Sequence, residues 1–191
     1  ADQAIKKLLK IKPNPFTLFS NVKLIKAGNL DDNLNLINDS DWVIEAIIED
    51  LKVKNKLYQK IDNIMHEDLI VSSNTSTIPL KILTKNLFKK FKKNFFITHF
   101  FNPPRYLKLI EIVKSKESDK EKLKKIINFC DIRLGKTIIE TKDTPGFIGN
   151  RIGIFWIERA VIEAINSNLT VEEADLIISN VFKVPKTGVF G

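Results

Sequence analysis

Short apolar runs alternate with longer amphipathic segments along most of this chain, and this alternation limits the folds open to it. The runs suited to β-strands lie at residues 21–30, 41–48, 69–73, 94–100, 107–113 and 136–140. Between them, residues 51–65, 79–90 and 118–131 place apolar side chains at the spacing of an α-helix. Strands that alternate with helices in this way predict an α/β fold, in which a mostly parallel sheet is covered by helices.

One connection is too short for a parallel crossover. Only a few residues separate His99 from Leu107, whereas two parallel neighbours need a connection of about a dozen residues or more. We therefore expect residues 107–113 to run antiparallel to a neighbouring strand, at one side of the sheet.

The pattern differs at the two ends of the chain. Residues 1–16 predict an amphipathic helix, and residues 146–166 predict a long apolar helix. Residues 170–182 predict a further helix, which begins with a capping box formed by Thr170 and Glu173. We place a domain boundary between Asp143 and Pro145, so that residues 1–143 form the α/β domain and residues 144–191 begin an all-α domain.

The composition is that of an ordinary soluble domain, with 191 residues of which 43% are hydrophobic and 28% charged. No run approaches the roughly 20 apolar residues that span a membrane, and residues 1–16 lack the apolar core of a signal peptide. The single cysteine, Cys130, excludes an internal disulfide and a cysteine-based metal cluster. The two histidines, His66 and His99, match no common metal-ligand spacing. We expect a cytoplasmic protein without a membrane span or a metal site.

The formal net charge is +8, and lysines alternate with phenylalanines most densely at residues 86–96. Such a patch is found in nucleic-acid-binding proteins. It also fits the end of a helix whose solvated lysines lead into a buried strand, and we favour this second interpretation, with no nucleic-acid partner. A positive field would also attract a small anionic ligand such as a nucleotide.

Polar residues follow three of the predicted strands, at the point where each strand ends. Glu49 follows VIEAII in the run 41–48, and the serines between Ser72 and Ser76 follow LIV in the run 69–73. His99 and Asn102 follow FFIT in the run 94–100. Each alone has a structural explanation, such as a helix start, a turn or a satisfied core histidine. Ligands of open α/β sheets, however, bind beyond the carboxyl ends of the strands. Three coincident strand ends therefore predict a binding site at this edge.

His99 and Glu111 together suit proton transfer. An imidazole can take and return a proton near neutral pH, and a carboxylate at its other nitrogen fixes the tautomer and stabilises the imidazolium. Such a pair can remove the proton from an alcohol whose carbon loses a hydride to a nicotinamide.

Five motifs resemble the 3-hydroxyacyl-CoA dehydrogenase family. They are WVIEAIIEDLKVK, VSSNTSTIPL, THFFNPPRYLKLIEIV, GKTIIETKDTPGFIGNRI and VPKTGVFG, and the resemblance extends over roughly residues 20–191. It is strongest to the bacterial long-chain members, which carry an enoyl-CoA hydratase in the same polypeptide. The resemblance implies an incomplete Rossmann-like, mostly parallel sheet with one antiparallel pair, followed by the start of an all-α C-terminal domain that serves dimerisation and substrate binding.

The resemblance also implies a function and site residues. The activity is NAD-dependent oxidation of an L-3-hydroxyacyl-CoA in fatty-acid β-oxidation, by a homodimer or a larger fatty-oxidation assembly. The implied roles are catalytic base for His99 and its partner for Glu111; cofactor contacts for Glu49, Lys54, Ser76 and Asn102; and substrate contacts for Ser76 and Asn150.

The sequence lacks two features of the family's cofactor-binding region. A fold of this type normally opens with a Gly-x-Gly-x-x-Gly turn that binds the pyrophosphate at a helix N-terminus. None of the seven glycines forms that turn, and an acidic ribose-binding residue is also missing. We therefore expect an internal fragment of a larger protein. An inactive remnant of such an enzyme is the alternative.

Overall fold

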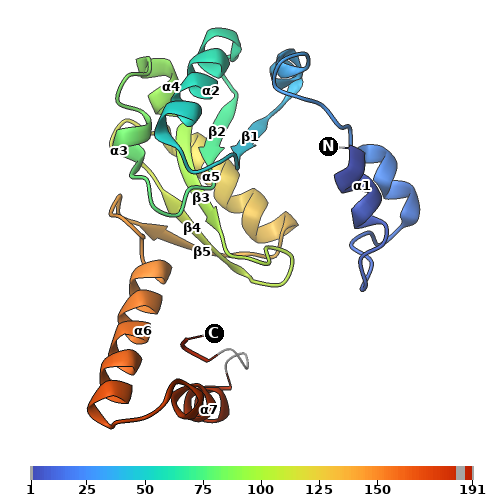
Figure 1. Ribbon diagram of the computed structural model, residues 1–191. Helices are drawn as coiled ribbons and strands as arrows, with labels where there is room; N and C mark the ends of the chain where they lie inside the picture. Colours follow the sequence, from blue (N-terminus) through green and yellow to red (C-terminus); the bar gives the residue numbers. More distant parts are fainter. Residues whose placement is uncertain (1, 184–187, 191) are drawn as a thin grey trace.

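The computed structural model describes residues 2–183 and 188–190, and its centre is a five-stranded sheet in the order β1-β2-β3-β4-β5 (Figure 1). The neighbours β1 and β2, β2 and β3, and β4 and β5 run parallel, and only β3 and β4 run antiparallel. The strands are Trp42–Glu45 (β1), Ile70–Ser73 (β2), Phe95–Phe100 (β3), Leu109–Val113 (β4) and Thr137–Thr141 (β5). The predicted α/β class and the antiparallel placement of residues 107–113 are therefore confirmed.

Helices cover the two faces of the sheet unequally. On one face lie α2 (Leu51–Ile64), α3 (Leu80–Leu83) and α4 (Lys89–Asn94), and on the other lies α5 (Lys120–Asn128), which continues into a π-helical turn at Phe129–Arg133. Aspartates cap the two longest of these helices, because Asp50 accepts from the Val53 N–H and Asp119 accepts from the Glu121 and Lys122 N–H groups. Such caps satisfy amide donors that the first helical turn leaves without partners.

The core is divided between the two faces, as the period-two alternation of strands requires. Ile97 and Val113 pack with the helices α2, α3 and α4, whereas Phe96 and Ile112 pack with α5. His99 and Glu111 lie two residues from Ile97 and Val113 along their strands. They therefore lie on the α2 side of the sheet.

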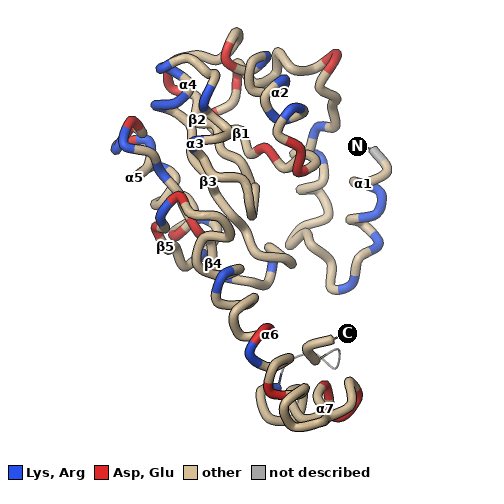
Figure 2. The backbone as a smooth tube through the Cα atoms, turned by 60° about the vertical axis from the view of Figure 1, so that its left-hand side comes forward, with Lys and Arg blue, Asp and Glu red and all other residues tan. Residues whose placement is uncertain are grey.

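The lysine-rich patch at residues 86–96 is a helix that leads into a buried strand. Lys89, Lys90 and Lys93 are exposed on α4, while Phe91 is buried and the chain then enters β3. Figure 2 shows lysine and arginine along α4 and α5. The helix-end interpretation of this patch is thus confirmed.

The prediction of a strand at residues 21–30 was wrong. Residues Phe19–Leu24 form a 3-10 helix (η1), and no strand follows it before a second 3-10 helix at Leu34–Asp39 (η2). A strand needs a neighbour to pair its backbone groups, and no described strand lies beside this segment, which leads from helix α1 (Asp2–Leu8) towards β1 (Figure 1). Its apolar pattern is therefore not sufficient to make a strand here.

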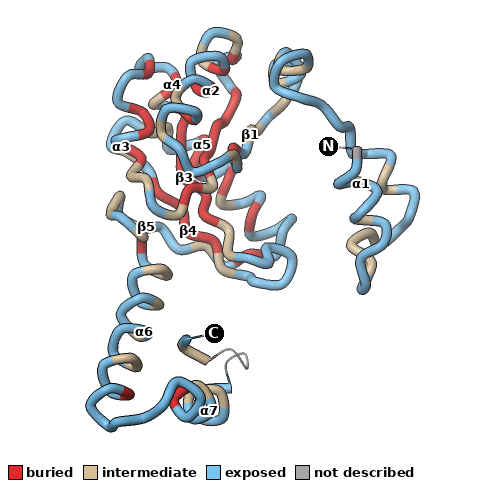
Figure 3. The backbone as a smooth tube through the Cα atoms, in the orientation of Figure 1, coloured by how far each residue is buried: buried red, intermediate tan, exposed pale blue. Residues whose placement is uncertain are grey.

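Two helices follow the sheet, α6 (Gly149–Asn166) and α7 (Val171–Phe182). The capping box of Thr170 and Glu173 at the start of α7 is confirmed. The first helix begins later than predicted, because Gly146 and Phe147 have positive φ angles of 74° and 46°. Figure 3 shows that both helices are mostly exposed, in contrast to the sheet. Residues 184–187 and 191 of the motif VPKTGVFG lie outside the described residues.

None of the helices in the described part of the chain has the length and apolar character that crossing a membrane requires.

Candidate active site

His99 and Glu111 lie directly opposite each other in the antiparallel pair of β3 and β4. Side chains of directly opposed residues project from the same face with their Cβ atoms about 5 Å apart. Here the imidazole Nδ1 and the carboxylate Oε2 are 2.8 Å apart, and both residues are buried. A carboxylate can only accept, so the neutral imidazole donates from Nδ1 and its Nε2 carries the lone pair. The pair thus has the arrangement of a general base and its orienting carboxylate.

The second oxygen of Glu111 binds the start of α6. Oε1 accepts from the backbone N–H groups of Ile148 and Gly149, each at 2.8 Å. The N-terminus of a helix carries unpaired amide donors and a partial positive charge, both of which favour a carboxylate. Glu111 therefore joins the histidine to the first turn of α6.

Aromatic rings enclose the histidine. The centroid of the imidazole is 4.6 Å from that of Phe101 and 5.7 Å from that of Phe147. Phe147 is buried and belongs to the core cluster on the α2 side. These rings limit access of water to the imidazole.

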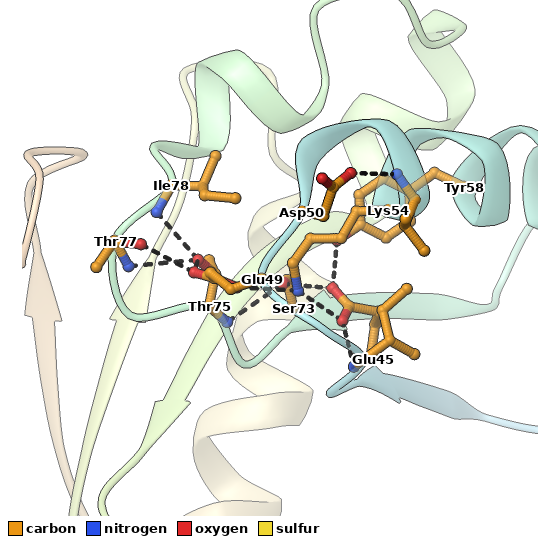
Figure 4. A network of polar contacts seen from close by, with 11 residues as sticks. Glu45, Glu49, Asp50, Lys54, Tyr58, Ser73, Thr75, Thr77 and Ile78 are labelled. Atoms are coloured by element: carbon orange, nitrogen blue, oxygen red, sulfur yellow. Dashed lines mark hydrogen bonds and ion pairs between the residues drawn. The ribbon is translucent and has the colours of Figure 1, made fainter.

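A second polar network lies at the ends of β1 and β2 and at the start of α2 (Figure 4). Its centre is Glu45, the last residue of β1, which is only 3% exposed. Its carboxylate accepts from Lys54 Nζ at 2.7 Å and from the Ile47 N–H at 2.7 Å through Oε1. Through Oε2 it accepts from the Tyr58 hydroxyl at 2.5 Å and the Ser73 hydroxyl at 2.6 Å. Burial raises the pKa of Tyr58, and the hydrogen bond to Glu45 raises it further. The phenol therefore stays a donor at neutral pH.

Glu49 lies at the outer end of this network. Its Oε1 accepts from the hydroxyls of Thr75 and Thr77, and its Oε2 is 3.2 Å from Lys54 Nζ. Partial burial acts to raise the pKa of Glu49, but the hydrogen bonds from Thr75 and Lys54 outweigh it and hold the pKa below its usual value. Glu49 is therefore an ionised and partly exposed carboxylate at neutral pH.

The remaining predicted site residues lie near these two networks. Ser76 is half-buried, and its carbonyl oxygen accepts from Asn150 Nδ2 at 3.4 Å, which brings the turn after β2 to the first turn of α6. Asn102 is exposed, three residues beyond His99. Lys54 is 1% exposed, and its Nζ lies between the carboxylates of Glu45 and Glu49. Lys54 is therefore beneath the rim of the sheet, whereas Glu49 is at the rim.

Sequence reasoning missed Glu45, although it accepts more hydrogen bonds than Glu49. The available signal was a charged residue within the apolar run 41–48, nine residues before Lys54. A buried carboxylate requires partners, and the lysine and tyrosine on one face of the following helix can supply them. Among the described residues, no group of histidine, cysteine and carboxylate side chains has the arrangement of a metal site.

The family model described as "3-hydroxyacyl-CoA dehydrogenase, NAD binding domain" matches residues 4–144. The chain belongs to the 3-hydroxyacyl-CoA dehydrogenase family. The match covers the five strands, the His99–Glu111 pair and the network around Glu45, but not the start of α6, and its description names this region as NAD-binding.

The relatives of this chain include much longer bacterial proteins. The chain is 45% identical over 188 residues to a putative fatty acid oxidation complex trifunctional enzyme of Rickettsia prowazekii, covering 98% of this chain and 26% of the relative. It is 42% identical over 188 residues to a probable 3-hydroxyacyl-CoA dehydrogenase of Bacillus subtilis, covering 98% of this chain and 24% of the relative. The chain thus spans about a quarter of the length of these relatives.

Solved structures share the fold. The crystal structure of FadB2 from M. tuberculosis superposes with a TM-score of 0.83 at 24% identity, over 96% of this chain and 65% of that chain. The crystal structure of (S)-3-hydroxybutyryl-CoA dehydrogenase PaaH1 from Ralstonia eutropha superposes with a TM-score of 0.76 at 27% identity, over 96% of this chain and 63% of that chain.

Proposed function

We propose that this chain is the part of an NAD-dependent 3-hydroxyacyl-CoA dehydrogenase that carries the catalytic base, and that it oxidises an L-3-hydroxyacyl-CoA to the 3-ketoacyl-CoA in fatty-acid β-oxidation. The observation that carries the proposal is the buried hydrogen bond between His99 and Glu111, at the carboxyl end of β3. The family membership supports the choice of substrate.

In this proposal, His99 removes the substrate's hydroxyl proton through Nε2. Glu111 holds the ring in the tautomer that leaves Nε2 unprotonated, and it stabilises the imidazolium that forms. A bound NAD would supply the hydride acceptor for the carbon that bears the hydroxyl group. In the reverse direction the same imidazolium returns the proton to the ketone oxygen.

We propose that the residues at the strand ends bind one half of the cofactor. Glu49, with the hydroxyls of Thr75 and Thr77, offers acceptors and donors at the rim of the sheet, and Asn102 offers an exposed amide. We assign Glu49, Ser76 and Asn102 to the nicotinamide riboside half, with Lys54 supporting Glu49 from below. The chain contains no Gly-x-Gly-x-x-Gly turn for the pyrophosphate, so we expect it to bind NAD weakly by itself.

Asn150 and Ser76 are proposed to contact the acyl-CoA, where α6 meets the turn after β2. The boundary at residues 143–145 would then separate the cofactor domain from a helical domain that pairs with a second subunit or with a fatty-oxidation assembly. Apolar side chains on both helices support an interface, because they are exposed at Ile152, Ile154, Phe155, Ile165, Leu176 and Val181.

The test is formation of NADH by a polypeptide that joins this chain to a segment with a Gly-x-Gly-x-x-Gly turn, supplied in the same chain or in trans. We expect NADH with an L-3-hydroxyacyl-CoA and none with its D isomer or with the free hydroxy acid. A folded preparation that forms no NADH from the L isomer would favour the inactive-remnant alternative and overturn the proposal.

A further inference from the structure

The buried carboxylate of Glu45 is the most fully engaged polar group on the cofactor side of the site. Each of its two oxygens accepts two hydrogen bonds, at distances between 2.5 and 2.7 Å. A carboxylate offers about four lone-pair positions, so none is left for a ligand. Since Glu45 is also 3% exposed, it acts on a ligand only through its neighbours.

One of those neighbours carries the effect of Glu45 to the rim. Lys54 is 2.7 Å from Glu45 Oε1 and 3.2 Å from Glu49 Oε2. A lysine side chain has many rotamers, and the inner carboxylate holds its ammonium group in a single place. The position of Glu49 is therefore set in part by Glu45.

A second neighbour carries the effect to the turn after β2. The Ser73 hydroxyl donates to Glu45 and accepts from the Thr75 N–H at 3.2 Å. Thr75 Oγ1 in turn accepts from the Ile78 N–H at 3.0 Å and donates to Glu49. The backbone of Glu45 takes part as well, since its carbonyl accepts from the Asn74 N–H at 2.8 Å. Both ends of the turn at residues 73–78, which contains Ser76, are thus tied to Glu45 and Glu49.

We propose that Glu45 is a positioning residue for cofactor binding: through Lys54 and Ser73 it fixes Glu49 and the 73–78 turn where the nicotinamide riboside half would lie. The identity of the ligand, NAD, rests on the proposed function. The effect of Glu45 on the 73–78 turn does not. Glu45→Gln is the variant that tests it. An amide of the same shape has one accepting oxygen and places an NH₂ group against donors.

The first measurement needs no activity. Amide hydrogen exchange in the 191-residue chain should be at least about tenfold faster at Asn74, Thr75 and Ile78 in Glu45→Gln than in the wild type. Exchange at Ile97 and Ile112, in the paired strands β3 and β4, should stay within about twofold. Glu140→Gln is the matched control, because Glu140 is an exposed carboxylate on β5 that pairs with Lys114, and it should leave the turn unchanged. Unchanged exchange in the 73–78 turn of Glu45→Gln would overturn the proposal.

The second measurement uses the NADH assay. Glu45→Gln should raise the KM for NAD by about tenfold and change kcat at saturating NAD by less than about threefold. The double variant Glu45→Gln/Lys54→Met should raise that KM by less than the product of the two single effects, because both act through one ion pair. An unchanged KM for NAD, or independent effects, would contradict the role.

The two arms separate the possible failures. If the wild type forms no NADH, the proposed function fails, and hydrogen exchange still decides whether Glu45 holds the turn. If Glu45→Gln does not fold, Ser73→Ala removes only the two hydrogen bonds of the Ser73 hydroxyl, to Glu45 and from the Thr75 N–H, and should loosen residues 74–78 alone. Unchanged exchange at those residues in Ser73→Ala would then overturn the proposal.

Discussion

At the scale of single residues, Glu111 has two duties that use different oxygens. Oε2 orients His99, and Oε1 accepts from the amides of Ile148 and Gly149. Three donors therefore converge on one buried carboxylate. The orientation of the proposed base and the attachment of α6 to the sheet depend on the same side chain.

Glu111→Gln should impair both duties. Glutamine has only one accepting oxygen, so its NH₂ group must face either the imidazole N–H or the helix amides. We expect a severe loss of kcat, together with a decrease of about 1–3 kcal/mol in the free energy of unfolding. Steady-state kinetics and urea denaturation measure the two effects, with Glu140→Gln as the control. A variant with the kcat and the unfolding free energy of the wild type would show that this carboxylate performs neither duty.

The histidine and its partner could be predicted from the sequence, but the carboxylate of Glu45 was not. His99 and Glu111 flank a loop too short for a crossover, so the sequence already places their strands side by side. Glu45 depends on Tyr58 and Ser73, whose side chains reach it only once β2 and α2 have packed on β1. The spacing of Lys54 and Tyr58 on one helix indicates part of this network, but their convergence with Ser73 depends on tertiary packing, which local pattern does not encode.

At the scale of elements, α5 and its π-helical end show how packing modifies a predicted helix. The sequence predicts one helix over residues 118–131, and the structure has α-helix at Lys120–Asn128 followed by the π-turn at Phe129–Arg133. The turn buries Cys130, which packs with Ile110 and Ile126 in the core cluster on the α5 side. The strand expected at residues 21–30 does not form, although its apolar pattern is present, because no described strand pairs with it.

The thiol of Cys130 reports on whether this element is packed. Burial raises its pKa to about 11, with a smaller opposing effect from the charge of Lys136. At a pH of about 8, only about one thiol in a thousand is then ionised, and the thiolate is the reactive form. Labelling by a thiol reagent should be at least about 100-fold slower in the native chain than in the same chain in denaturant. Equal rates in the two conditions would mean that α5 does not cover this face of the sheet.

At the scale of the whole molecule, three strand ends and one helix start meet at the proposed site. Glu49 and Ser76 lie in the segments that follow β1 and β2, His99 lies near the end of β3, and the first turn of α6 contacts the site through Glu111 and Asn150. The antiparallel pair follows from the short connection between His99 and Leu107, whereas the strand order was not predicted from the sequence. The position of α6 does not follow from the sequence pattern, because it depends on a buried carboxylate and on the positive φ angles at Gly146 and Phe147.

The role of His99 is tested by kcat for oxidation of an L-3-hydroxyacyl-CoA. It is measured for the wild type and for His99→Gln, each reconstituted with a Gly-x-Gly-x-x-Gly segment. General-base catalysis contributes about 10² to 10⁴-fold to a rate. We therefore expect kcat to fall by at least about 10²-fold, while the KM for NAD changes much less. A loss of less than about tenfold in His99→Gln would be far smaller than a general base contributes. In that case His99 is not the base, and the central claim is wrong.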